Sequence, residues 1–168
     1  MRALVQRVTE AEVTSRATSD QPWESVGKIG AGLCVLVGIT PSDSEAEAVK
    51  IANKIWGLRV FGDETGVMNL SLGDAGDGSG AAPREVLVVS QFTLYGDTTK
   101  GRRPSWVAAG RPEQAEPLVE LVVETLGDLG AAVEAGRFRT DMRVALVNDG
   151  PVTLMLEVER PPDPVDQN

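Results

Sequence analysis

The segment "GLCVLVGI", residues 32–39, is an uninterrupted apolar run with the length of a β-strand. A strand with apolar side chains at successive positions has to be covered on both faces, so the fold must place a layer on each side of it. Helical spacing of apolar residues occurs in two places, after Pro41 and after Pro112. About seven strand patterns are grouped rather than alternating with these helices. This arrangement favours an α+β domain with mixed sheets and the two helices on one side.

Local patterns define the expected elements. Ser42 with Glu45 and Ser44 with Glu47 both have capping-box spacing, so the first helix is expected to begin there and to end near Gly57. The second helix is expected to begin at Gly110–Pro112 and to end at Gly130. Strands are expected at 2–8, 11–15, 32–39, 58–62 and 85–92. A hairpin is expected at the end of the chain, with strands at 143–147 and 152–158 joined by a turn at "NDGP".

The length indicates a single domain. A chain of 168 residues buries about 70% of the surface that its unfolded form exposes, so a full core is available. We expect the domain at residues 1–160 and a flexible polar tail at 161–168, with a surface insert rich in Gly, Asp and Ser at 73–83. No apolar run approaches the ~20 residues of a membrane helix, and the opening residues alternate in strand fashion, unlike a signal peptide. We therefore expect a cytoplasmic protein that does not contact a membrane.

The composition excludes several kinds of chemistry. The chain has no histidine and one cysteine, Cys34, which lies inside the apolar run. Neither an internal disulfide nor a zinc site of cysteine or histidine ligands can be built, so no metal and no cofactor are expected. The chain also lacks the glycine-rich patterns that bind dinucleotides or nucleoside triphosphates. The net charge of -9 argues against sequence-independent coating of nucleic acid, although a local basic patch is still allowed.

The strand at 85–92 ends in polar residues: Ser90, Gln91 and Thr93 surround Phe92. A hydroxyl group is a weak nucleophile unless a base removes its proton, and histidine, the commonest such base, is absent. A lysine in the following loop, at position 100, is a candidate base for Thr93. Two other interpretations stay open: these side chains satisfy backbone groups at the end of the strand, or the backbone here binds a substrate.

The loop "DTTKGRRPSW", residues 97–106, contains the one basic cluster of this acidic chain. Lys100, Arg102 and Arg103 lie close together beside Trp106. Contact with phosphate or RNA is one interpretation, and a solvated loop anchored by its tryptophan is the other. Composition does not decide between them.

The segment "NDGPVT", residues 148–153, lies between two apolar stretches. Its residue types favour a hairpin turn. Because residue 151 is a proline, the preceding peptide bond has a base rate of about 5–6% for the cis form, and a cis bond would fix the direction of the neighbouring carbonyl groups. The sequence leaves the isomer open.

Together, "SQFTL" at 90–94 and "NDGPVT" at 148–153 resemble the two signature motifs of the D-aminoacyl-tRNA deacylases, the D-tyrosyl-tRNA(Tyr) deacylase family. The resemblance extends over nearly the whole chain up to about residue 158. It includes the segments "LVQRV", "GAGLCVLVGI", "GVMNLS", "GDTTKGRRPSW" and "GRFRTDM".

The resemblance implies a fold, a partner and a reaction. The expected fold is a three-layer β/β/α subunit. Two such subunits would form a homodimer, and the protein would act at the 3′ end of D-aminoacyl-tRNA. The expected reaction is hydrolysis of the ester that releases a free D-amino acid. Gly150 and Pro151 would form a Gly-cisPro unit that enters the partner subunit's pocket and excludes L side chains. Because exclusion needs no recognition of the side chain, many D-amino acids would be accepted. Glycine mischarged on tRNA(Ala) should enter as well.

The resemblance also implies roles for individual residues. Arg7 would hold the Gly-Pro unit, Phe138 and Met142 would lie near the terminal adenosine, and the backbone of the "SQFT" segment would contact the ester. Ser90, Gln91 and Phe92 belong to this segment. Lys100, Arg102 and Arg103 would contact the tRNA. The 2′-hydroxyl of the tRNA would have the key catalytic role, with the Thr93 side chain dispensable, although an older proposal makes Thr93 the nucleophile.

Two departures from the family pattern lie in "GRFRTDM". Arg139 and Thr140 stand where the family more often has small residues, so the details of the adenosine pocket are expected to differ. Two alternatives also stay open at this point. One is a non-catalytic tRNA-binding module that uses the basic loop, and the other is a conventional hydrolase with Thr93 as its nucleophile.

Overall fold

The computed structural model describes residues 1–74 and 84–160. Most of the expected insert at 73–83 and the whole of the expected tail at 161–168 lie outside these residues. In chain order the elements are β1 (Arg2–Arg16), β2 (Glu24–Ile29), β3 (Gly32–Gly38), α1 (Glu45–Trp56), β4 (Phe61–Gly62), β5 (Met68–Leu70), β6 (Glu85–Ser90), the 3-10 helix η1 (Phe92–Tyr95), α2 (Pro112–Asp128), β7 (Ala132–Ala135) and β8 (Asp141–Glu157).

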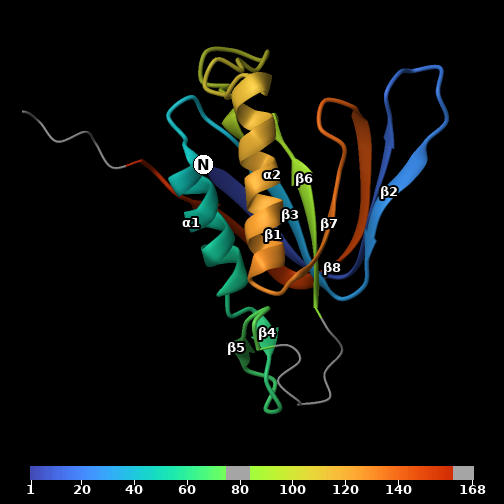
Figure 1. Ribbon diagram of the computed structural model, residues 1–168, viewed down its shortest axis with the longest axis vertical. Helices are drawn as coiled ribbons and strands as arrows, with labels where there is room; N and C mark the ends of the chain where they lie inside the picture. Colours follow the sequence, from blue (N-terminus) through green and yellow to red (C-terminus); the bar gives the residue numbers. More distant parts are fainter. Residues whose placement is uncertain (75–83, 161–168) are drawn as a thin grey trace, which may run out of the picture.

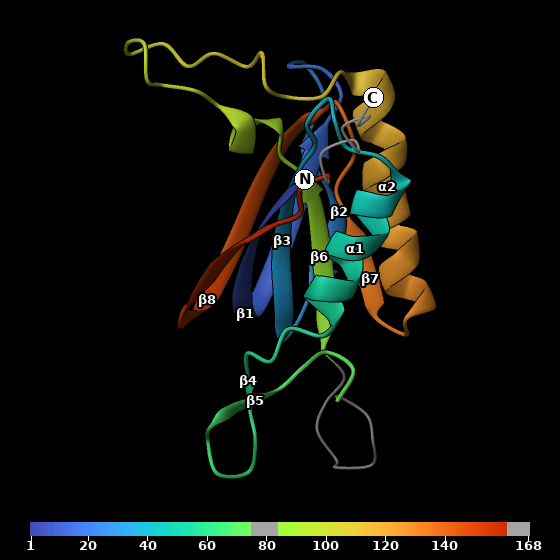
Figure 2. The same cartoon turned by 90° about the vertical axis from the view of Figure 1, so that its left-hand side faces the viewer.

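Six strands form one mixed sheet, and both helices cover the same side of it (Figures 1 and 2). β3 pairs in parallel with β6, and β6 pairs in parallel with β7, while β1 pairs antiparallel with β2, β3 and β8. β4 and β5 form a separate small ribbon. The expected α+β class, with mixed strands and helices on one side, is confirmed.

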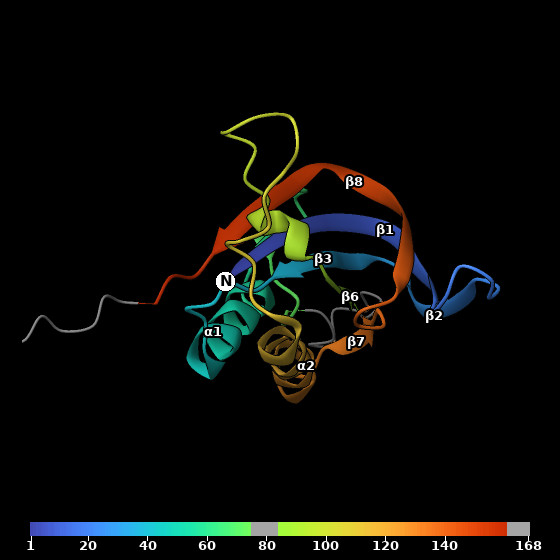
Figure 3. The ribbon, with the colours of Figure 1, turned by 90° about the horizontal axis from the view of Figure 1, so that it is seen from above.

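The long strand β1 makes the sheet curl. Its first half pairs with β3 and its second half with β2, whereas the opposite edge of β1 pairs with β8. Figure 3 shows β8 and β1 arching over β3 and β6, with the helices below. One apolar core lies between helices and sheet, and a second core lies inside the curl around Val13, Cys34 and Leu87. The apolar run at 32–39 is therefore covered on both faces, as its composition requires.

The two helices follow their sequence signals. Ser44 donates hydrogen bonds from its backbone N–H and its hydroxyl to Glu47 Oε2, at 2.9 and 2.6 Å, and these bonds hold the pKa of Glu47 below its ordinary value. Of the two capping boxes in the sequence, the second is the one that forms. In α2, Leu118, Val122 and Leu126 form part of the buried stripe that faces the core. Within residues 1–74 and 84–160, neither helix combines the length and the apolarity needed to cross a membrane.

The expected hairpin at the end of the chain is wrong. Residues 141–157 form one strand, β8, that runs beside β1 along its length. Between the pairs Gln6 with Thr153 and Val8 with Asn148, β8 contains residues 149–152 where β1 contains a single residue. The "NDGP" segment therefore bulges from a continuous strand, because pairing with β1 on both sides of it outweighs its local preference for a turn.

We predict that Gly32→Ala destabilises the fold. A Cβ at this position would lie 1.9 Å from the Glu85 carbonyl oxygen, and backbone atoms of paired strands cannot move aside. The expected loss is about 1–3 kcal/mol of unfolding free energy, measured by chemical denaturation. Gly127→Ala is the matched control, because it lies in α2 with open space around it and should gain up to about 1 kcal/mol. Equal stability of the two variants would contradict this account of β3 and β6.

Candidate functional site

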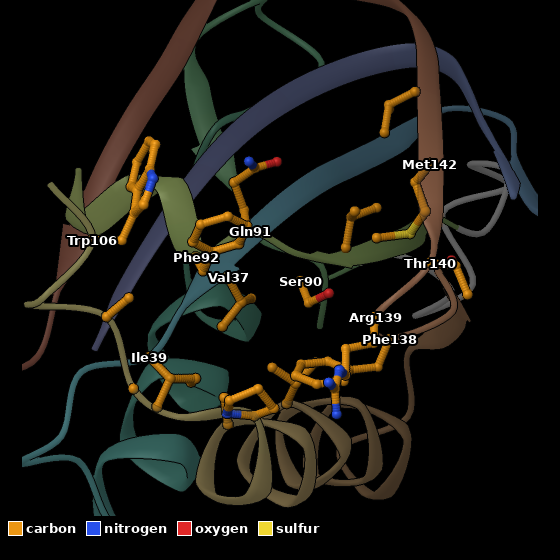
Figure 4. A pocket seen from close by; sticks show the side chains of 17 residues that line it. Val37, Ile39, Ser90, Gln91, Phe92, Trp106, Phe138, Arg139, Thr140 and Met142 are labelled. Atoms are coloured by element: carbon orange, nitrogen blue, oxygen red, sulfur yellow. The ribbon is translucent and has the colours of Figure 1, made fainter. Parts of the chain in front are cut away.

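A pocket of about 510 Å³ opens where β3 and β6 end (Figure 4). The two strands are parallel, so their carboxyl ends meet at the same edge of the sheet, and the start of α2 closes the opposite side. The walls are mostly apolar and come from five parts of the chain: Val37, Ile39, Val89, Ser90, Gln91, Phe92, Trp106, Ala109, Gly110, Pro112, Ala115, Val119, Phe138, Arg139, Thr140, Met142 and Val144.

The polar strand end forms one wall of this pocket. The Gln91 backbone N–H donates to the Val37 carbonyl oxygen at 2.7 Å, after which the chain turns sharply into η1. Gly38 permits this close approach, since an added Cβ would lie 3.0 Å from the Gln91 carbonyl oxygen and 3.1 Å from Leu94 Cβ. Of the site residues predicted in the "SQFT" segment, Ser90, Gln91 and Phe92 line the pocket.

Thr93 lies outside the pocket lining, and its side chain is exposed. Its hydroxyl accepts a hydrogen bond from the Gln91 side-chain amide. Across residues 1–74 and 84–160, no amine or carboxylate hydrogen bonds to this hydroxyl, and the candidate base Lys100 lies in the exposed loop. The arrangement provides no base that would activate Thr93 as a nucleophile.

The turn at 137–140 and the start of β8 form the other wall. Phe138 and Met142 line the pocket, as do the two departures from the family pattern, Arg139 and Thr140. The Thr140 hydroxyl lies 2.6 Å from the hydroxyl of buried Ser15 and donates to a carbonyl oxygen of the same turn at 2.9 Å. These bonds attach the turn to β1, so the position of the pocket wall depends on the curled sheet.

An aromatic pair stands at the opposite end of the pocket. Phe92 and Trp106 pack edge to face, with ring centroids 5.3 Å apart and an interplanar angle of 74°. Both side chains are largely exposed, at 57% and 42%. Trp106 thus packs against η1 at the surface, where it is not part of either buried core.

The basic loop extends away from the body of the protein beyond this aromatic pair (Figure 2). Backbone hydrogen bonds of 2.9 and 2.8 Å between Asp97 and Ser105 close its base. The Thr99 backbone N–H donates to Asp97 and holds the pKa of that carboxyl below its ordinary value. Lys100, Arg102 and Arg103 are exposed at the far end, outside the pocket lining.

Gly150 and Pro151 are exposed in the bulge of β8 and do not line the pocket of their own chain. The peptide bond between them is cis. Arg7 fixes the bulge through Asp149, with its Nε 2.8 Å from a carboxylate oxygen and 3.3 Å from the carbonyl oxygen. Arg7 also donates to the Val60 carbonyl oxygen. The predicted link between Arg7 and this segment therefore runs through Asp149.

Metal and thiol chemistry receive no support from the described residues. Among them, no three His, Cys, Asp or Glu side chains are grouped so as to hold a metal ion. Burial raises the pKa of Cys34 to about 11, so this residue stays a neutral thiol in the core.

Sequence reasoning did not identify the wall contributed by the loop before α2 and by the helix itself. Ala109, Gly110, Ala115 and Val119 have no reactive group, so their residue types carried no chemical signal. The small residues Ala108, Ala109 and Gly110 between Trp106 and the helix were the one indication in the sequence, because small side chains let a loop backbone lie close to a cavity or a ligand.

The comparison with known families gives a match over almost the whole chain. The D-Tyr-tRNA(Tyr) deacylase family matches residues 4–157. The chain belongs to this family. The expectation drawn from "SQFTL" and "NDGPVT" is thereby confirmed.

Curated members of the D-Tyr-tRNA(Tyr) deacylase family are about half identical to the chain. A D-aminoacyl-tRNA deacylase of Symbiobacterium thermophilum is 53% identical over 160 residues, covering 95% of this chain and 97% of the relative. One from Streptomyces griseus is 49% identical over 161 residues, covering 94% and 100%.

Solved structures share the fold. A structure of the c-Myc DNA unwinding element binding protein has a TM-score of 0.81 and 38% identity, covering 95% of this chain and 100% of its own. A probable eukaryotic D-amino acid tRNA deacylase has a TM-score of 0.73 at 13% identity, covering 94% and 98%. The second structure shows that a protein with very different sequence has the same fold.

We predict that Ala109→Phe blocks the pocket, because its side chain lines the cavity from a loop and not from the core. Deacylation of D-tyrosyl-tRNA, the reaction in the family's name, should fall about tenfold or more in kcat/KM. Ala108→Phe is the matched control, since Ala108 is exposed and does not line the pocket. If both variants melt like the wild type and retain full activity, this pocket is not the site of the reaction.

Proposed function

We propose that the chain hydrolyses the ester between a D-amino acid and the terminal adenosine of tRNA. Membership in the D-Tyr-tRNA(Tyr) deacylase family makes it a hydrolase. The observation that carries the proposal is the pocket itself, which residues of the "SQF" and "GRFRTDM" segments help to line in a chain about half identical to D-aminoacyl-tRNA deacylases. An apolar pocket of this size suits an adenosine with an attached amino acid.

Selection of the D form is proposed to depend on a second copy of the chain. Gly150 and Pro151 lie exposed on a bulge that Arg7 and Asp149 hold in place, away from the pocket of the same chain. Exposed apolar side chains flank the bulge along β8: Val144, Val147, Leu154 and Met155. We propose that β8 forms a homodimer interface and that the bulge enters the partner subunit's pocket.

In this arrangement, rejection of L-amino acids is steric. Backbone carbonyl groups of the inserted bulge would face the α-amino group of the substrate and leave no space for an L side chain. A D side chain points elsewhere, so its chemical nature matters little. Glycine has no side chain to exclude, and glycyl-tRNA(Ala) is accordingly proposed as a second substrate.

The catalytic hydroxyl is proposed to belong to the RNA. The chain has no histidine, and the Thr93 hydroxyl lies outside the pocket lining with an amide as its partner. Water would add to the ester carbonyl carbon, the bond to the 3′-oxygen would break, and that oxygen would leave with a proton. The neighbouring 2′-hydroxyl of the terminal adenosine would position the water and assist the proton transfer. Backbone groups around Gln91 and Phe92 would hold the ester.

Binding of the remainder of the tRNA is assigned to the basic loop. Lys100, Arg102 and Arg103 are exposed on the loop whose Trp106 lines the pocket, so they can contact phosphates without burying charge. Acting on tRNA would place the protein in the cytoplasm, where it would remove D-amino acids before they reach the ribosome.

The direct test compares D-tyrosyl-tRNA with L-tyrosyl-tRNA. Steric exclusion predicts release of the D-amino acid at least about 100-fold faster than release of the L-amino acid, measured by the loss of labelled amino acid from tRNA. Equal rates on both substrates would contradict chiral selection. Salt-sensitive binding without any loss of amino acid would instead favour a non-catalytic tRNA-binding module.

A further inference from the structure

Arg139 is the one charged residue among those that line the pocket. Its side chain is exposed, and within residues 1–74 and 84–160 no hydrogen bond or ion pair engages its guanidinium group. Two neighbouring arginines, in contrast, have an ion-pair or aromatic partner. Arg137 pairs with Glu24 at 2.9 Å, and Arg143 stacks on Trp23 with its guanidinium carbon 4.1 Å from the ring centroid. Of these three arginines, Arg139 is the one without such a partner among the described residues, so its guanidinium group is available to a ligand in the pocket.

The backbone at Arg139 is unusual as well. Its φ of 61° is the one positive value among the non-glycine residues that the structure describes. The left-handed conformation is unfavourable for a residue with a Cβ, and glycine would adopt it more easily. The bonds of Thr140 to Ser15 and to the turn hold this geometry in place. A side chain kept at a strained position in a pocket wall points to a functional role.

The location of Arg139 indicates which part of a substrate it meets. In Figure 4, Arg139, Phe138 and Met142 lie at one end of the pocket, Phe92 and Trp106 at the other. If the ester lies at the "SQF" wall, the nucleoside occupies the end with Phe138. The anionic group of the tRNA at that end is the phosphodiester on the 5′ side of the terminal adenosine.

We propose that Arg139 binds this phosphodiester. Arginine offers paired N–H donors that match two phosphate oxygens, and such charge-assisted bonds are stronger than neutral ones. A positive charge in a pocket of a protein with net charge -9 also favours the anionic 3′ end locally. The inference rests on the proposed function. It adds a contact that would be particular to chains with arginine at this position, and it gives Arg139 a positioning role without part in bond cleavage.

The test uses Arg139→Ala with three substrates: D-tyrosyl-tRNA, D-tyrosyl-adenosine, and D-tyrosyl-adenosine bearing a 5′-phosphate. Loss of the contact should raise KM about 10-fold to 100-fold for the two substrates that contain the phosphate, with kcat within about twofold. For D-tyrosyl-adenosine, the variant and the wild type should have the same KM. Arg137→Ala is the matched control, because it removes the same charge two residues away, outside the pocket, and should leave all three KM values unchanged.

A second variant separates binding from folding. Arg139→Gly relieves the positive φ, so it should melt about 2–4 °C above the wild type while showing the same rise in KM. A stabilised variant with weakened binding cannot be explained by damage to the fold.

Three results would overturn the assignment. They are an unchanged KM for D-tyrosyl-tRNA in Arg139→Ala, an equal rise in KM for the adenosine ester without phosphate, and an equal effect of Arg137→Ala. The second result would indicate that Arg139 contacts the amino acid or its released carboxylate instead. Failure of the proposed function is distinguishable, because the wild type would then release no D-amino acid from any of the three substrates.

Discussion

The pairing of β1 with β8 on both sides of the bulge is the interaction on which the rest of the structure depends. β1 joins β3 on its other edge over one half and β2 over the other, so its length forces the sheet to curl around a second apolar core. The same pairing fixes the positions of two segments of β8. Its first residues continue from the turn that forms a pocket wall, and its middle residues bulge where the register with β1 shifts.

The bulge and the pocket have different structural requirements. In the proposed mechanism the bulge has to be rigid and exposed, and the ion pair between Arg7 on β1 and Asp149 helps to fix its position. In the same proposal the pocket has to hold an ester in place and admit the attacking water, and its walls are mostly apolar side chains with backbone groups at the strand end. Neither requirement calls for a catalytic side chain. A protein that supplies shape and backbone donors, with the reactive hydroxyl on the RNA, is consistent with a chain that contains no histidine.

The sequence predicted correctly those elements whose formation depends on local patterns of residues. Two overlapping capping boxes placed the start of α1 at Ser42 or Ser44, of which the structure uses Ser44, and the unbroken apolar run marked β3 as a strand covered on both faces. It failed where pairing over a long distance decides the outcome. The "NDGP" segment has the composition of a hairpin turn, yet it lies inside β8 because the apolar stretches on both sides pair with one strand. Ser90 and Gln91 identified the polar strand end as a candidate site. Ala109 and Ala115 could not be predicted to line the pocket, because alanine side chains have no polar or reactive group.

The claim that the RNA supplies the catalytic hydroxyl is the centre of this account. It is tested most directly with D-tyrosyl-tRNA that ends in 2′-deoxyadenosine, assayed against the wild type and Thr93→Val in parallel with the normal substrate. We predict that the wild type cleaves the deoxy substrate at least about 100-fold more slowly than the normal one, and that Thr93→Val cleaves the normal substrate at nearly the wild-type rate. Normal cleavage of the deoxy substrate together with an inactive Thr93→Val would contradict the account and make Thr93 the nucleophile.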